Sequence, residues 1–419
     1  MVSVLLVVGI AVAVFVGYNI GGSSTGVAFG PAVGSRITGK TLAAALFTGF
    51  ALLGGWTVGR EVVATMGGEI VPSSQFTLAA SVVVLFFTGL SLLISNLFGV
   101  PASTSMTAVG AIVGLGVATD SLNESVMFGI VSAWIVAPLV AFWAGVVIGR
   151  YIYPHLNARI SFGRLENGLL RLDRSGTIPR PVLQEGATTR DLVGAAVVLL
   201  VACYNAFSAG ASNVANAIAP LVGSNAITID QGIILAAVAI AIGAFTIARR
   251  TLDTVGDGIT DLSILAAILV SLVAATIITI LSNLGIPASL AVSMTSCIIG
   301  LGWGRSSRTV TLADAAGSAI EGEGRPDFSV NALAADGDKG GDGGGGPQAA
   351  PTVGDLATAE DTTESASTGT VPKIGEEKPE ELPEDDLFDA AATGRIVTMW
   401  LLTPTVSAIG SYLVFLLIF

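Results

Sequence analysis

Ten apolar segments separated by polar stretches limit this chain to a fold built around a lipid bilayer. Eight of them are 18 to 24 residues long and nearly free of charge, close to the ~20 residues that an α-helix needs to cross the hydrocarbon core. Hydrophobic residues make up 52% of the chain, more apolar surface than a soluble domain can bury. The sequence therefore predicts an all-α polytopic membrane protein. The ten segments are 1–18, 41–58, 76–95, 103–118, 126–149, 192–209, 230–248, 262–282, 288–303 and 396–419.

Basic residues are distributed unevenly among the loops. If all ten segments cross the membrane and the N-terminus lies outside, the inner loops hold 14 Lys and Arg residues and the outer loops hold only Arg60, with the long acidic loop set aside. Such a bias is the positive-inside pattern of multi-pass proteins. Treating the two short segments as re-entrant would move the basic stretch after Arg150 to the outer face. We therefore expect five crossings in each half, a plasma-membrane location and an N-terminus outside.

The two halves of the chain carry the same sequence pattern. SNLFGVPASTSMTAVGAIVGLG (95–116) matches SNLGIPASLAVSMTSCIIGLG (282–302), and AFGPAVGS (28–35) matches AIAPLVGS (217–224). These matches keep one order and an offset of 186 to 189 residues, which indicates an internal duplication. With an odd number of crossings per half, the second copy lies upside down in the membrane, as in inverted-repeat secondary transporters.

The chain divides into membrane parts and cytoplasmic parts. Between Asp314 and Asp389 there are 19 acidic and 4 basic side chains, and this stretch lacks hydrophobic periodicity. Such a segment buries too little apolar surface to fold, so we expect a disordered, solvating loop. The expected parts are a first membrane repeat (1–150), a basic cytoplasmic linker (151–190), the first part of the second repeat (191–303), the acidic disordered cytoplasmic loop (304–394) and a final transmembrane helix (395–419).

Two kinds of motif interrupt the apolar pattern, and each occurs once per half. The first is NIGGSSTGVAFGPAVGS (19–35), with its partner SAGASNVANAIAPLVGS (208–224). Both are rich in small and polar residues and contain a proline, Pro31 or Pro220. Such segments are poor lipid-facing helices, so we expect broken or re-entrant segments that line a polar cavity.

The second motif is PAST (101–104), with its partner PASL (287–290). Proline favours the first position of a helix, and serine then lies in the first turn. The unpaired N–H groups and the positive dipole end of such a helix bind an oxyanion without a buried cation.

Hydroxyls and amides from these motifs form the predicted binding site. Because they both donate and accept hydrogen bonds, they suit a tetrahedral anion and a coupling cation. The alternative is that small residues simply allow close helix packing, but recurrence in matching places of an inverted repeat favours binding. The candidate residues are Ser23, Ser24, Thr25, Ser103, Thr104, Ser105, Ser212, Asn213, Asn216 and Ser289.

Other kinds of chemistry find little support in the sequence. His155 is the only histidine, which argues against a histidine metal site or proton relay. We find no combination of nucleophile, histidine and acid, and no nucleotide-binding loop, so we expect neither an enzyme nor a resident cofactor.

At these motifs the sequence resembles the inorganic phosphate transporter (PiT) family. GASNVANA (210–217) resembles the family's GANDVANA, and PASTSM (101–106) resembles its PVSTTH, with Met106 in place of histidine. The resemblance implies a phosphate importer driven by Na⁺ or H⁺. The family's motif acids are absent, because Ser24 and Asn213 occupy their positions.

The function expected from these observations is secondary active transport of a small inorganic oxyanion by alternating access, with phosphate as the first choice. A neutral site repels a divalent anion less than an acidic site does, so a sulfate permease of the same family is one alternative. A non-transporting anion receptor or regulator is another. The expected partners are phosphate or sulfate, the lipid bilayer and a possible second copy in a homodimer, but no nucleic acid.

Overall fold

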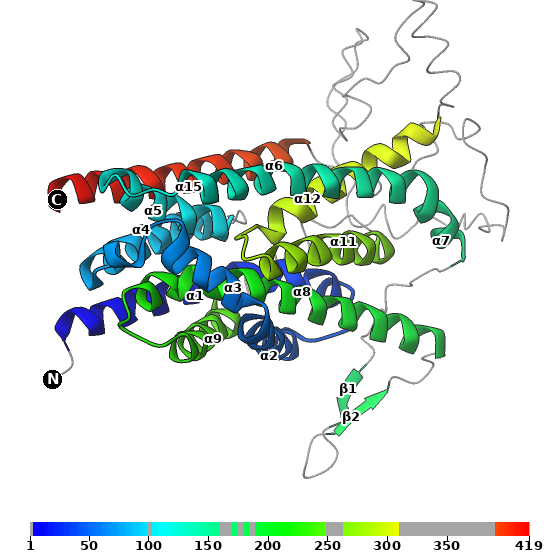
Figure 1. Cartoon of the computed structure of the whole chain (residues 1–419). Helices are drawn as coiled ribbons and strands as arrows, with labels where there is room; N and C mark the ends of the chain where they lie inside the picture. Colours follow the sequence, from blue (N-terminus) through cyan, green and yellow to red (C-terminus); the bar gives the residue numbers. More distant parts are fainter. Residues whose placement is uncertain are drawn as a thin grey trace, which may run out of the picture.

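The computed structural model describes residues 3–98, 103–159, 170–173, 180–183, 189–248, 263–309 and 390–418. They form a bundle of long helices. The beginning of the first helix and the end of the last helix lie at the same side of the molecule (Figure 1). One short antiparallel strand pair, β1 (Leu170–Asp173) and β2 (Arg180–Leu183), stands apart from this bundle. The predicted disorder of the acidic loop, and most of the predicted basic linker, fall outside the described residues.

The first repeat begins with α1, a single helix of 31 residues and about 46 Å. The chain then returns through α2 and α3, which are bent by 66° relative to each other. The last long helix of the repeat is α6. The elements are α1 (Val4–Gly34), α2 (Lys40–Thr57), α3 (Gly59–Ala64), η1 (Thr65–Glu69), η2 (Ser73–Gln75), α4 (Leu78–Leu97), α5 (Thr104–Ala118), α6 (Glu124–Val147), η3 (Ile148–Ile152) and α7 (Tyr153–Arg159).

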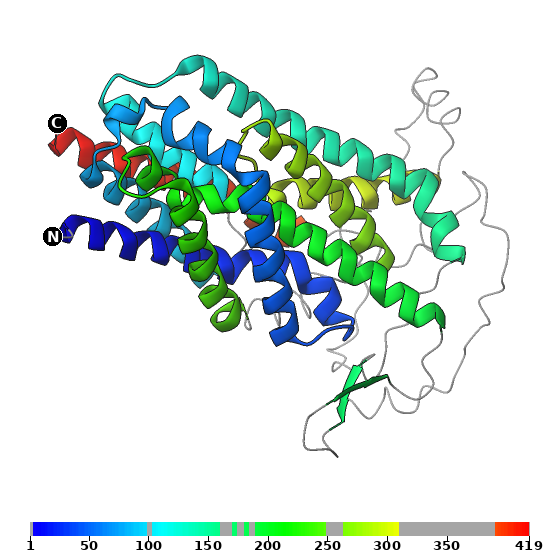
Figure 2. The same ribbon diagram turned by 60° about the horizontal axis from the view of Figure 1, so that its bottom comes forward.

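The second repeat follows the same order. A long helix comes first, and a shorter helix, a pair of helices and a final long helix follow. In the view of Figure 2, α2 (blue) and the α9 helix of this repeat (green) both run obliquely to the long helices. The elements are α8 (Thr189–Gly223), α9 (Ile229–Thr246), α11 (Ile264–Asn283), α12 (Leu290–Ser306), η4 (Ser307–Thr309) and α15 (Ala390–Ile418).

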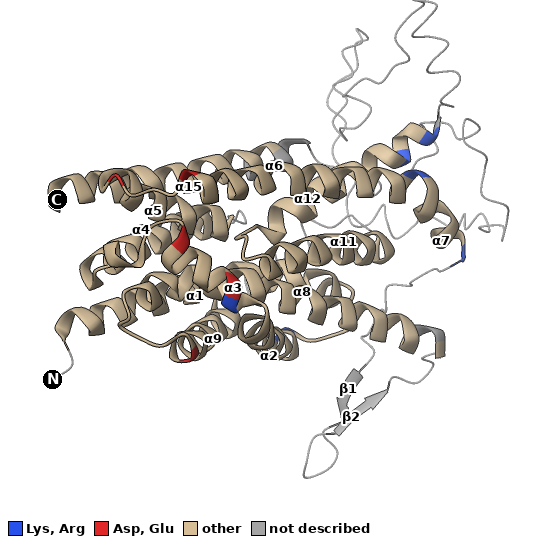
Figure 3. Ribbon diagram, in the orientation of Figure 1, with Lys and Arg blue, Asp and Glu red and all other residues tan. Residues whose placement is uncertain are grey.

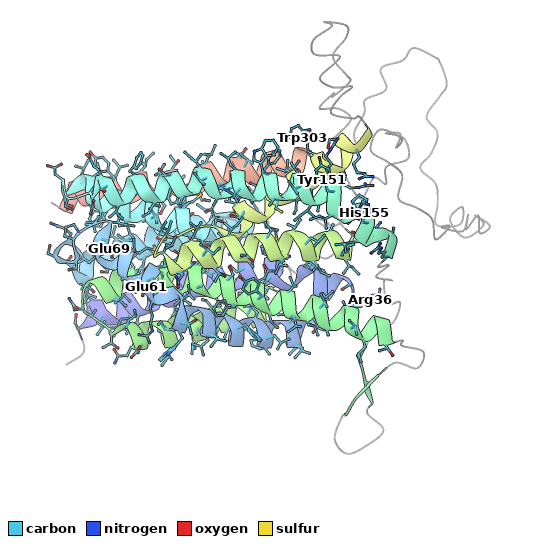
Figure 4. All side chains as sticks on the ribbon, turned by 45° about the vertical axis from the view of Figure 1, so that its right-hand side comes forward. Arg36, Glu61, Glu69, Tyr151, His155 and Trp303 are labelled. Atoms are coloured by element: carbon cyan, nitrogen blue, oxygen red, sulfur yellow. The ribbon has the colours of Figure 1, made fainter. Side chains whose placement is uncertain are left out.

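Charged residues mark the two ends of the bundle (Figure 3). We call the end that holds Arg36, Tyr151 and His155 the basic end, because Lys and Arg gather there (Figure 4). The opposite end, where the N-terminus and Glu69 lie, is the acidic end. The predicted asymmetry of charge is therefore present between the two ends of the bundle.

The helices α4 and α5 form a hairpin that enters from the acidic end and stops at mid-depth. The α4 helix begins beside Gly9 of α1 and ends where Asn96 Nδ2 donates to Asn19 Oδ1 at 3.0 Å, half-way along α1. The α5 helix then turns back, and just beyond its end Asn123 N donates to Ile70 O at 2.9 Å.

The helices α11 and α12 form the matching hairpin from the basic end. At its outer ends, Ser263 Oγ lies 2.8 Å from Tyr153 Oη, and Arg150 donates to the carbonyl of Ser307. At its tip, Trp134 Nε1 in the middle of α6 donates to Pro287 O at 2.8 Å. The two hairpin tips therefore meet inside the bundle.

The described helices do not confirm the expectation of five crossings per half. In the described residues seven helices are long and apolar enough to span a bilayer, or eight with the bent α2–α3 pair, but α4 and α11 turn back at mid-depth. If both hairpins stop inside the bilayer, each half crosses three times in the described residues, which is still odd, so the repeat remains inverted. Because a hairpin removes two crossings together, every later loop keeps its predicted side and the positive-inside bias survives.

The inversion is visible in how the two repeats pack. An added Cβ at Gly21 of α1 would lie 2.0 Å from Ile240 O of α9, and one at Gly210 of α8 would lie 2.0 Å from Ala51 O of α2. The two contacts are equivalent, because Gly210 lies 189 residues after Gly21 and Ile240 lies 189 residues after Ala51. The first helix of each repeat thus packs on the second helix of the other repeat, backbone against backbone.

The first pair of motifs departs from the expected break. Both α1 and α8 run through their motifs without interruption, because Pro31 and Pro220 fall in the last turn of each helix. Proline there removes one helical hydrogen bond, which leaves the rest of the helix intact. Beyond the last turn the chain reverses at Arg36 (φ 58°) and at Asn225 (φ 53°).

The orientation of the bundle can be tested by cysteine labelling. Asn123 at the acidic end and His155 at the basic end are both exposed, while Cys203 and Cys297 are buried. With an impermeant maleimide on intact cells, we expect Asn123→Cys to be labelled and His155→Cys to be labelled only after permeabilisation. The reverse pattern would contradict the orientation.

The cavity between the hairpin tips as a candidate binding site

A small cavity lies at mid-depth, where α1 and α8 pass the two hairpin tips. Its volume is about 20 Å³, enough for one or two water molecules. A bound oxyanion would therefore have to push the tips apart. The cavity is lined by Ser23, Ser24, Val27, Thr104, Ala209, Asn213, Ser289, Leu290 and Ala291.

Asn213 is the centre of the hydrogen-bond network around this cavity. Its Oδ1 accepts from Thr104 Oγ1 of α5 and from Asn216 Nδ2 at 3.1 Å, and its Nδ2 donates to Ser24 Oγ of α1 at 3.2 Å. This amide therefore joins three helices at the depth where the repeats cross.

A second set of bonds connects the two hairpin tips. Ser105 Oγ of the first tip donates to Ala288 O of the second at 3.1 Å and accepts from Asn216 Nδ2 at 3.3 Å. Ser289 accepts from Val292 N at 3.4 Å and so caps α12. The tips are held together by single hydrogen bonds, which a ligand could replace.

Two polar atoms of this network are buried without a hydrogen-bond partner in the described part of the chain, Ser103 Oγ and Asn216 Oδ1. An unsatisfied buried group costs about 1–3 kcal/mol. Ser103 precedes α5 as its N-cap but makes no side-chain capping bond. Neither residue lines the cavity itself, but each is next to a residue that does, Thr104 in sequence and Asn213 through a hydrogen bond.

The N-termini of α5 and α12 both point into this region. The helices begin at Thr104 and Leu290, with Ser103 and Ser289 as N-caps, so the expectation that proline opens each helix is wrong for Pro287, three residues upstream of α12. Pro101 lies outside the described residues. The first-turn amides of a helix have no partner within it and carry its positive dipole end.

The ten residues predicted from the sequence fall into three groups. Five line the cavity and three lie directly behind it in the network, whereas two turn away. Thr25 Oγ1 donates to Gly21 O of its own helix at 2.7 Å, and Ser212 Oγ to Ala209 O at 3.5 Å. The cavity residues are Ser23, Ser24, Thr104, Asn213 and Ser289, and those behind it are Ser103, Ser105 and Asn216.

The apolar part of the lining was missed by sequence reasoning. Val27 lies one helical turn after Ser23, and Ala209 lies one turn before Asn213. Helical spacing from the polar residues is the signal that identifies them. A second cavity on the other side of Ser289 is lined by Met106 and Trp134, among others.

The cavity lining contains no charged side chain. Arg60 and Asp230 form an ion pair outside the cavity, and both side chains are partly exposed. Glu69 accepts from Thr65 Oγ1 at 3.3 Å, in agreement with a role outside the site. No cluster of metal-ligating His, Cys, Asp or Glu is found among the described residues.

The sequence matches the PHO4 phosphate transporter family over residues 20–320. This chain belongs to the phosphate transporter family. The match covers both repeats up to the end of α12, and so includes every residue of the cavity. Membership makes the chain a multi-pass membrane transporter, as the sequence motifs and the apolar helices indicate.

Individual members of the phosphate transporter family carry different names. The sulfate permease CysP of Bacillus subtilis is 32% identical over 71% of this chain and 77% of its own length. A Haemophilus influenzae protein named as a phosphate permease is 25% identical over 71% of this chain and 87% of its own length. A solved structure, described as the sodium-dependent phosphate transporter, superposes with a TM-score of 0.63 at 18% identity and covers 99% of both chains. That likeness confirms the fold.

Proposed function

We propose that this chain is a secondary active transporter that carries a small inorganic oxyanion, phosphate first, across the plasma membrane. The observation that carries the proposal is an uncharged cavity of hydroxyls and amides where two helix N-termini meet. Such groups bind an anion without a buried cation. Asn216 Oδ1, an unpaired acceptor, suits the protonated oxygen of hydrogen phosphate.

Sulfate is the second candidate, and a different observation favours it. No carboxylate lines the cavity to accept a proton from phosphate, and sulfate carries no proton at neutral pH. The relative with 32% identity is named a sulfate permease. Labelled phosphate and sulfate, each in competition with the other in proteoliposomes, distinguish the two substrates.

The proposed driving ion is Na⁺ or H⁺. Pro31 has no N–H to give to the carbonyl of Val27, four residues earlier, and Pro220 has none for the carbonyl of Asn216. Both carbonyls belong to residues at or behind the cavity, and such oxygens suit a hard cation. Uptake under an imposed Na⁺ gradient, and separately under a pH gradient, tests the coupling. Binding of labelled anion without flux under either gradient would instead indicate a receptor.

We expect Ser103→Ala and Asn216→Ala each to lower labelled-anion uptake by about 10- to 100-fold, because a hydrogen bond to a charged group is worth ~1.5–3 kcal/mol. Thr88→Val is the matched control, since Thr88 is a buried hydroxyl bonded to its own helix and lies outside the cavity. Unchanged uptake in both variants would refute this site.

A further inference from the structure

Asn205 is a buried amide that the proposed site does not use. It lies on α8, its side chain is 0% exposed, and neither Oδ1 nor Nδ2 has a hydrogen-bond partner among the described residues. Most buried polar side chains in proteins are satisfied. Two unpaired ends on one buried amide therefore point to a partner outside the described residues, and a bound ion is the one considered below.

The position of Asn205 relates it to the cavity. It shares one face of α8 with Ala209, one turn on, and Asn213, two turns on, both of which line the cavity. Because α8 runs from the basic end to the acidic end, Asn205 lies on the basic side of the cavity, about 12 Å from Asn213 along the helix axis.

The amide at the corresponding place on the other side of the cavity, Asn19, is paired. Asn19 lies one turn before Ser23 on the acidic side, where its Oδ1 accepts from Asn96 and its Nδ2 donates to Phe15 O at 2.8 Å. The α11 helix, which contacts α8 through Ser208 Oγ and Ala275 O at 3.0 Å, adds two further unpaired hydroxyls, those of Thr279 and Ser282. Thr279 and Ser282 lie between this contact and the hairpin tip, nearer the cavity than Asn205 does. The contrast that matters is therefore between two amides on the long helices: Asn19 of α1 is paired, and Asn205 of α8 has no partner among the described residues.

We propose that Asn205 is an inner subsite for the transported oxyanion, occupied between the cavity and the basic end. This inference rests on the proposed transport function. The Nδ2 group offers two donors to the oxygens of a tetrahedral anion. One amide binds more weakly than the hydroxyls and amides that four helices contribute to the cavity, so an ion that reaches Asn205 moves on and does not become trapped.

Asn205→Leu tests the subsite, because leucine keeps the branched shape of the side chain and removes both polar atoms. We expect uptake of labelled phosphate and sulfate in proteoliposomes to fall at least tenfold, while the equilibrium affinity of the detergent-solubilised protein for the same labelled anions stays within twofold. Asn205→Asp, which places a negative charge on the path, is expected to lower uptake further. Ser208→Ala is the matched control on the same helix and is expected to transport like the wild type.

Three outcomes would contradict the subsite. Wild-type uptake by Asn205→Leu would show that no ion contacts this amide. Loss of binding together with uptake, as expected for Asn216→Ala, would place Asn205 in the main site. An unfolding temperature below that of the wild type would assign Asn205 a structural role. Failure of the wild type itself to bind or transport either anion would instead refute the proposed function.

Discussion

Gly54→Ala is expected to destabilise the protein by about 3 kcal/mol or more, the upper range for overpacking a close contact. The added Cβ would lie 1.9 Å from Phe207 O and 2.8 Å from Phe207 C. These are backbone atoms of α8, which cannot rotate away as a side chain does. The α2 and α8 helices would have to separate, and with them the contact that joins the two repeats. Thermal unfolding in detergent, followed by size-exclusion chromatography, measures the effect.

Gly49→Ala is the matched control on the same helix, because no atom lies within 4 Å of a Cβ at that position. Alanine is the better helix former, so we expect equal or slightly higher stability. Gly243→Ala repeats the test at the pseudo-symmetric position, where the Cβ would lie 2.0 Å from Tyr18 O. Equal unfolding temperatures for Gly54→Ala and Gly49→Ala would disprove the close packing of α2 on α8.

Asn213→Asp is expected to lower uptake of the oxyanion more than 100-fold at neutral pH. A carboxylate ~5 Å from the ion repels each unit of its charge by about 3 kcal/mol at an effective dielectric constant of ~20. The fold is expected to survive, because the carboxylate still accepts from Thr104 and Asn216 and Ser24 Oγ can turn to donate. Uptake of labelled phosphate and sulfate over a range of Na⁺ concentrations measures the effect. Higher Na⁺ concentrations are expected to restore part of the lost uptake.

Asn123→Asp carries the same change of charge far from the cavity. Asn123 is the exposed N-cap of α6, a position that aspartate fills equally well, so transport and stability are expected to stay at the wild-type level. If Asn213→Asp transported as well as Asn123→Asp, the anion would have to bind elsewhere in the molecule.

The hairpins have a consequence for how such a transporter would work. Single hydrogen bonds from Ser105 and Trp134 hold the second tip, at Ala288 and Pro287, whereas the long helices pack backbone against backbone at glycines. The tips are therefore the parts that separate at the lowest cost in free energy. An ion larger than the present cavity would enter by parting them, and the inverted repeat would allow this from either end.

Most of the site residues predicted from the sequence lie together in the structure, and their role in binding stays a prediction. Serines and asparagines in matching places of both repeats identified eight residues in or directly behind the cavity. Thr25 and Ser212 were included because neighbouring residues share a motif, yet adjacent residues on a helix point about 100° apart. Asn205 belongs to a Tyr-Asn pair that occurs in both repeats, at residues 18–19 and 204–205, but this pair did not identify it as a ligand. Only the absence of a partner among the described residues distinguishes it.

The sequence alone determined that this chain is an inverted pair of helical membrane repeats with a polar centre. The lengths of the apolar segments, the duplicated motifs and the charge of the loops were sufficient, because each of these properties is local or periodic in the sequence. Whether α4 and α11 cross the bilayer or turn back was decided only by tertiary structure. A helix of 20 residues has the same composition in either case, and the contacts of Asn96 with Asn19 and of Trp134 with Pro287 place the turn at mid-depth.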